Sequence, residues 1–272
     1  HGAESIRFES DALQAAMVPN GIKTETQLEI LVFSKQSLPL GAHSLQVSTQ
    51  QGDSNKLKLH IDHLPQVSEE PQSLSNVQPS NALPLNIWGR ITSAGQEDKF
   101  RFEAKKGQGL VFDAAANSLG SKADIVISLN NHDGQPLASS QSFDNSIDPL
   151  LFHQFEEDGI YEISISERFL KSSDDHFYRL SMGAYPFVTD VMPRLAPKNQ
   201  EVSLQLIGYN LTKEDKLDIE TGSENSQSVS IDPIHYRFRK APKIELSDWD
   251  TVKELEPNNT PYEATQLAVG HN

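Results

Sequence analysis

The residues of this chain best suited to chemistry are oxygen-bearing side chains near its end. Four of them fall within six residues: Glu254, Glu256, Asn258 and Asn259. Carboxylate and amide oxygens suit calcium, which binds about six to eight hard oxygens and tolerates the geometry of a loop. The spacing therefore predicts a calcium site, and the alternative is an acidic, solvated linker.

Other reactive side chains lack catalytic partners in the sequence. The run Asp174-Asp175-His176 contains a His and two carboxylates but no evident nucleophile, and it predicts a polar turn. Asp144 and Asp148 could form an acid and base pair, but the turn-forming residues between them favour a solvated loop. Neither Gly-x-Ser-x-Gly nor His-Glu-x-x-His occurs, although a triad can also be assembled from distant residues. We predict that the chain is not an enzyme.

The composition restricts the kinds of molecule that the chain could bind. The 272 residues carry a formal net charge of -15, which argues against nucleic acid or an anionic membrane surface, since binding such polyanions depends on Lys and Arg. Cysteine is absent, which removes disulfides, thiolate zinc sites and a Cys nucleophile. No apolar run approaches the roughly 20 residues that span a bilayer, and no signal peptide is recognisable. Because the chain begins with His1, we expect a processed piece of an exported protein.

The middle of the chain has the pattern of an all-β fold. In residues 100–104, Phe100, Phe102 and Ala104 share one face of a predicted strand and charged residues share the other. Residues 161–166 repeat this alternation. Asp133-Gly134 lies between two apolar runs and supplies the positive φ angles that a tight hairpin requires. Strands separated by such closely spaced turns predict a β-sandwich.

Changes in composition predict several modules. Strand patterns before residue 65 predict a small first β unit, and a Ser, Pro, Glu, Gln and Asn-rich stretch then leads into the central unit. Another small β unit follows the central one, and Thr260, Pro261 and Glu263 fit the first turn of a short helix. The predicted domains are residues 1–65, 66–183, 184–250 and 251–272.

The central segment resembles the bacterial pre-peptidase C-terminal domain, a β-sandwich of secreted proteins. The flanking units resemble the immunoglobulin-like IPT/TIG fold, with the first unit incomplete and residues 251–272 similar to the start of a second pre-peptidase C-terminal domain. The resemblance implies a jelly-roll-like sandwich flanked by immunoglobulin-like units. The matching central segments are Gly89-Arg90-Ile91, residues 96–104, Lys106-Gly107-Gln108, Leu119-Gly120-Ser121, Asp133-Gly134, residues 148–152, Asp158-Gly159-Ile160-Tyr161 and Tyr178-Arg179-Leu180.

The resemblance also implies calcium ligands. In collagen-binding relatives, a Glu-x-Glu-Pro-Asn-Asn lead-in and an Asp before the Phe-x-Phe strand hold calcium. Residues 254–259 keep that lead-in. In the central unit, Glu70 stands in the lead-in and Asp98 stands before Phe100-Arg101-Phe102, so these two residues are the second candidate pair.

The predicted function is that of a non-catalytic extracellular module, secreted or at the cell surface or in the periplasm. It would bind a protein or a polysaccharide and space other domains of one long polypeptide. The alternative is an accessory region of a secreted peptidase whose catalytic domain lies outside these residues. Aromatic residues could line a ligand surface or belong to the core, and the sequence leaves both open for Trp88, Phe143, Phe155 and Tyr185.

Overall fold

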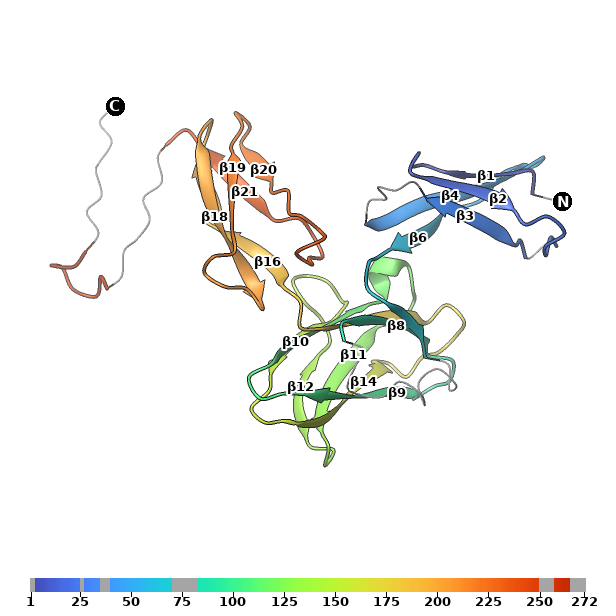
Figure 1. The fold of residues 1–272 in the computed structure, drawn as a ribbon, viewed down its shortest axis with the longest axis horizontal. Coiled ribbons are helices and arrows are strands. Elements are labelled where there is room, and N and C mark those ends of the chain that lie inside the picture. Colours follow the sequence, from blue (N-terminus) through green and yellow to red (C-terminus); the bar gives the residue numbers. More distant parts are fainter. Residues whose placement is uncertain (1–2, 25–26, 35–39, 70–82, 250–256, 265–272) are drawn as a thin grey trace. The chain divides into compact units, whose positions relative to one another are not determined.

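The computed structural model describes residues 3–24, 27–34, 40–69, 83–249 and 257–264 (Figure 1). Contacts between residues divide the chain into two compact units. Unit 1 comprises residues 1–106, 112–151 and 155–183, and unit 2 comprises residues 107–111, 152–154 and 184–272. The predicted division into four domains stays a prediction.

Two small sheets form the start of unit 1. One contains β1 (Ser5–Phe8), β4 (Gly41–Thr49), β5 (Gly52–Asp53) and β6 (Leu57–Ile61). The other pairs β2 (Leu13–Met17) with β3 (Ile30–Ser34). The strands predicted here from alternation are present, but few of their side chains are buried, among them Leu13 and His43.

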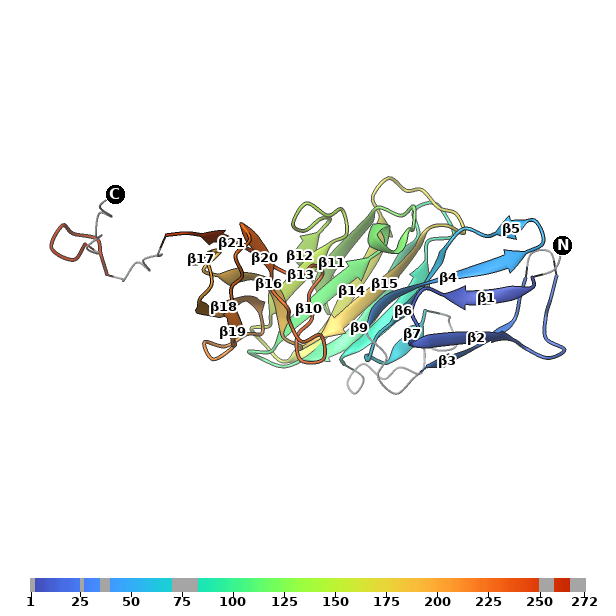
Figure 2. The same cartoon turned by 90° about the horizontal axis from the view of Figure 1, so that it is seen from above.

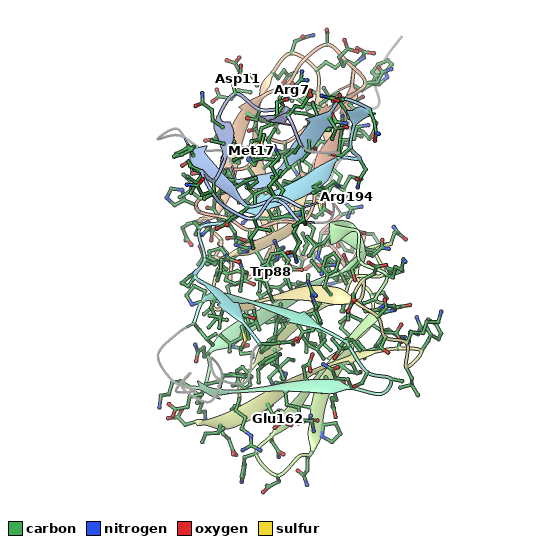
Figure 3. The ribbon with its side chains drawn as sticks, turned by 90° about the vertical axis from the view of Figure 1, so that its right-hand side faces the viewer. Arg7, Asp11, Met17, Trp88, Glu162 and Arg194 are labelled. Carbon is green, nitrogen blue, oxygen red and sulfur yellow. The ribbon has the colours of Figure 1, made fainter. Side chains whose placement is uncertain are left out.

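Two larger sheets face each other in the rest of unit 1 and form a β-sandwich (Figure 1), which Figure 2 shows from above. The ends of two of its strands, residues 109–111 and 152–154, belong to unit 2. Trp88 on one sheet and Glu162 on the other mark its opposite outer sides (Figure 3). The five-stranded sheet has the order β13 (Leu150–Gln154), β10 (Gly109–Ala115), β15 (Phe177–Gly183), β8 (Leu85–Arg90) and β7 (Gln66–Ser68). The four-stranded sheet has the order β12 (Pro136–Ser140), β11 (Ile125–Asn131), β14 (Gly159–Glu167) and β9 (Glu97–Ala104).

The alternation in the sequence explains these strands. Phe100, Phe102 and Ala104 on β9 are buried, as predicted, and the charged residues between them face outward. The predicted hairpin joins β11 to β12, with Gly134 at a φ of 78°. The side-chain oxygen of Asn131 accepts the N–H groups of Asp133 and Gln135, which fixes the turn.

Unit 2 contains two three-stranded sheets around one core. The first has the order β16 (Phe187–Met192), β18 (Glu201–Tyr209) and β19 (Lys216–Glu220), and the second β17 (Leu195–Pro197), β21 (Lys243–Ser247) and β20 (Ser226–Ser228). Its fully buried side chains include Val191, Leu204 and Ile244. Residues 260–263 form a turn, so the short helix predicted there is wrong: the capping residues close one turn without continuing it.

Helix is confined, in the described ranges, to the 3₁₀ turn η1 (Asn117–Leu119). No helix among them is long and apolar enough to cross a membrane.

Candidate functional site

The predicted calcium ligands are only partly within the described residues. Glu70, Glu254 and Glu256 lie outside them. Asn258 is half-buried and Asn259 is exposed, just before the turn at residues 260–263. In the part of the chain that the structure describes, no three His, Asp or Glu side chains gather closely enough to hold a metal ion. The calcium site therefore stays a prediction.

Asp98, the other candidate ligand, lies beside a buried tyrosine. The hydroxyl of Tyr178 on β15 is 2.9 Å from Asp98 Oδ2 and 2.8 Å from Oε2 of Glu69, which directly follows β7. Glu69 Oε1 accepts the backbone N–H of Arg90 at 2.5 Å. Tyr178 is fully buried, so its hydroxyl joins carboxylates from both sheets inside the sandwich.

A glycine makes room for this contact. Gly89 on β8 lies so close that a Cβ there would overlap both the Glu69 carboxylate and the Tyr178 hydroxyl. Any other residue at this position would push the two groups apart. The position thus belongs to the site although it carries no side chain.

Burial dominates the electrostatics of Glu69. It raises the pKa of Glu69 to about 7, and the charge of Asp98 acts in the same direction. Burial, together with the neighbouring carboxylates, raises the pKa of Tyr178 well above its usual range, so this residue remains a neutral phenol. A phenol has one proton, so it donates to one carboxylate; the other contact is a hydrogen bond when Glu69 is protonated and donates to Tyr178.

The oxygens of this pair already have donors. Asp98 Oδ1 accepts from Gln96 Nε2 at 2.8 Å, and Glu69 Oε1 accepts from Arg90. A cation bound here would displace Tyr178 or one of these donors, and the described residues supply far fewer than the six to eight or so oxygens that calcium takes. The arrangement is a hydrogen-bond bridge through the Tyr178 hydroxyl that ties the two sheets together.

A Ser and His contact also occurs, in the region predicted to be a polar turn. Ser173 Oγ lies 2.7 Å from His176 Nδ1 and accepts the backbone N–H of Asp175 at 3.2 Å. His176 is buried, and its Nε2 has no hydrogen-bond partner in the described part of the chain. A hydrolase triad needs a carboxylate on the second ring nitrogen to orient the base. The pair lacks that group and closes a local turn.

Asp148 differs from its sequence-based interpretation. It was expected in a solvated loop, but its side chain is buried and accepts three backbone N–H groups at the start of η1. The distances are 3.1 Å from Ala116 N, 2.8 Å from Asn117 N and 2.9 Å from Ser118 N. The carboxylate therefore holds a loop and is not one member of an acid and base pair with Asp144.

The loop after β14 presents the most exposed aromatic ring of the central sandwich. The Phe169 side chain is 58% exposed and its neighbour Leu170 is 63% exposed. Beneath them, Oε2 of the buried Glu167 accepts the N–H groups of Phe169 at 2.8 Å and Lys171 at 2.7 Å. We call residues 167–171 the Phe169 loop. It was missed in the sequence because four residues without alternation carry no strand or helix signal.

The aromatic residues that were considered as a ligand surface are mostly interior. Phe155 and Tyr185 are buried, so the core interpretation is correct for them. Trp88 is half-buried, and its Nε1 donates to Gln66 Oε1 at 2.7 Å. Phe143 is half-buried in a turn. Phe169 is thus a better candidate for ligand contact than any of these four.

Comparisons with known proteins give weak likenesses. No protein-family model and no curated protein match the sequence. The pre-peptidase C-terminal domain of a Bacillus anthracis collagenase matches with 12% identity and a TM-score of 0.30, covering 46% of this chain and 98% of that one. The secreted serine protease VesC from Vibrio cholerae matches with 15% identity and a TM-score of 0.27, covering 66% of this chain and 42% of VesC. A β-sandwich carbohydrate-binding module matches with 10% identity and a TM-score of 0.23, covering 66% of this chain and 84% of the module. The β-sandwich assignment rests on the sheets of this chain.

Proposed function

We propose that this chain is a non-catalytic extracellular module of a secreted bacterial protein, which binds a protein or polysaccharide and spaces neighbouring domains. Its central unit would be a pre-peptidase C-terminal-like sandwich with IPT/TIG-like units on either side. The observation that carries the proposal is that the buried polar groups described above make structural hydrogen bonds. Tyr178, Asp148 and Glu167 each hold a strand or a loop in place through hydrogen bonds.

Such groups stabilise a scaffold because a buried carboxylate that accepts several N–H groups is satisfied only in one backbone conformation. A catalytic carboxylate or His needs at least one face open to a reacting atom. A rigid sandwich with exposed loops suits binding, since loops on a fixed scaffold carry ligand contacts in many β-sandwich proteins.

A binding screen tests the proposal directly. The full chain would be applied to arrays of bacterial and host glycans and of extracellular matrix proteins, with and without calcium. Saturable binding to at least one member supports the proposal, and heat-unfolded protein serves as the control. Binding to none of the glycans or matrix proteins, with or without calcium, would contradict it.

A further inference from the structure

The Phe169 loop is the feature of the central sandwich that its own packing does not explain. Phe169 and Leu170 stand side by side at the end of β14, and each exposes more than half of its surface. Exposed apolar side chains occur singly on most proteins, whereas two adjacent ones on a fixed loop form a small apolar patch that a partner can cover. Exposure alone does not identify the partner.

Two cationic side chains lie beside the Phe169 ring. The Arg168 guanidinium lies 5.3 Å from the centre of the Phe169 ring, and Lys171 Nζ lies 5.5 Å from it. Cations at these distances are attracted to the ring, which holds them beside it. The loop therefore presents two cations and two apolar side chains above one buried carboxylate, Glu167, on a chain whose net charge is -15.

The backbone N–H groups of the loop already have hydrogen-bond acceptors within the protein. Arg168 N donates to Asp124 O at 2.8 Å, and Leu170 N donates to Glu167 O at 3.2 Å. Glu167 Oε2 takes the N–H groups of Phe169 and Lys171. All four N–H groups from residue 168 to residue 171 are thus satisfied within the protein, so a partner can cover them without leaving an unpaired donor.

Leu170 adopts a conformation that its residue type rarely takes. Its φ is 58°, in the left-handed region that favours glycine. Non-glycine residues held in this region tend to occur at functional sites, where the surrounding structure compensates for the strain. Here the Glu167 carboxylate provides that support, because it holds the backbone N–H groups on both sides of Leu170.

We infer that the Phe169 loop binds an acidic peptide segment that carries aromatic or aliphatic residues. Phe169 and Leu170 cover the apolar side chains of the segment, and Arg168 and Lys171 pair with its carboxylates. The inference rests on the proposed binding function and names the ligand class and the site. A flat anionic membrane fits less well, because the whole surface would repel a chain of net charge -15.

The chain itself supplies a probe of this chemistry. Residues 246–257, Leu-Ser-Asp-Trp-Asp-Thr-Val-Lys-Glu-Leu-Glu-Pro, contain four acidic residues, one Lys and three large apolar residues after the first. Trp249 within this segment is 70% exposed in the structure. A synthetic fluorescent peptide of this sequence is the first probe, and its Asn and Gln analogue without acidic residues is the matched control.

The experiment measures fluorescence anisotropy of the two peptides with the full chain in buffer containing EDTA. We expect saturable binding of the acidic peptide, at least tenfold weaker binding of the neutral analogue, and weakening as NaCl rises from about 0.05 to 0.5 M. Phe169→Ala/Leu170→Ala and Arg168→Gln/Lys171→Gln each weaken binding at least tenfold. The control variant Leu137→Ala/Ile147→Ala, which changes two exposed apolar residues elsewhere on the sandwich, binds like wild type.

Three results overturn the inference: no saturation, equal binding of the neutral peptide, or equal binding by the Phe169→Ala/Leu170→Ala variant. Tighter loop-dependent binding to phosphatidylglycerol vesicles or to alginate than to the peptide also overturns it, because the ligand would then be a membrane or an acidic polysaccharide. Failure here stays distinct from failure of the proposed function. An array ligand that binds all loop variants equally would leave the module a binding protein and remove the Phe169 loop as its site.

Discussion

The Tyr178 hydroxyl and the Glu69 carboxylate lie 2.8 Å apart although 109 residues separate them in the sequence. Their contact joins the residue that follows β7 to the interior of the central sandwich. Because Tyr178 also contacts Asp98, its hydroxyl bridges two carboxylates: it donates its own proton to one of them and accepts a proton from Glu69 when Glu69 is protonated. The stability of the sandwich should therefore depend on pH and on each of these groups.

The first prediction concerns pH. The pKa of Glu69 is about 7 in the folded protein against 4.5 for an ordinary Glu, because burial disfavours the charged carboxylate. A raised carboxyl pKa stabilises the fold below pH 4.5, and this contribution is lost as pH rises from 4.5 to about 7. The loss is on the order of 1 kcal/mol once solvent screening of the half-exposed group is allowed for.

Glu69→Gln should abolish this part of the pH dependence. Urea unfolding of the full chain at several pH values between 4.5 and 7.5 measures it. Glu103→Gln on the exposed face of β9 is the matched control and should keep the wild-type slope. An unchanged slope in Glu69→Gln would show that Glu69 titrates normally.

The second prediction concerns the hydroxyl that bridges the carboxylates. Tyr178→Phe removes the hydroxyl that bridges Glu69 and Asp98, so the free energy of unfolding should fall by about 2 kcal/mol at pH 7. Tyr161→Phe removes one hydrogen bond, to the Glu157 carbonyl oxygen at 2.9 Å, and should cost about 1 kcal/mol or less. Chemical denaturation measures the free energy of unfolding of both variants. Equal losses in the two variants would argue against a hydroxyl that bridges two carboxylates at Tyr178.

The third prediction concerns Asp148. An Asn at this position presents an amide N–H₂ to at least one of the three N–H groups that the carboxylate accepts, so Asp148→Asn should destabilise the chain by about 2 kcal/mol. Asp144→Asn, at an exposed turn residue with a φ of 46°, should be nearly neutral, because Asn tolerates this conformation. Melting temperatures test both. A neutral Asp148→Asn would mean that the loop at η1 does not depend on the charge.

Much of the fold was predictable because strand alternation and turn chemistry are local. The burial of Phe100 and Phe102 and the hairpin at Asp133-Gly134 followed from neighbouring residues alone. The helix expected at residues 260–263 is a turn in the described residues, because capping residues alone do not overcome the cost of forming the first helical turn. Only the turn was fixed by the local sequence.

The polar sites were less predictable because they join distant segments. Asp98 was singled out, but its contacts come from Tyr178 and Glu69, and neither the pairing of strands nor the gap at Gly89 is visible in the sequence. The burial of Asp148 depends on a loop more than thirty residues away. A turn-rich sequence around such a residue predicts a side chain exposed to solvent. Only the folded loop shows that the Asp148 carboxylate is buried.

The proposed function depends on the claim that the chain is not catalytic. Ser173 offers the most direct test of that claim, because its hydroxyl contacts His176. The full chain would be incubated with a fluorophosphonate reagent and with peptide and polysaccharide libraries, and adducts and products would be detected by mass spectrometry. The account predicts no adduct at Ser173 and no products, in wild type and in Ser173→Ala alike. An adduct at Ser173, or products that disappear in Ser173→Ala and His176→Ala, would contradict it.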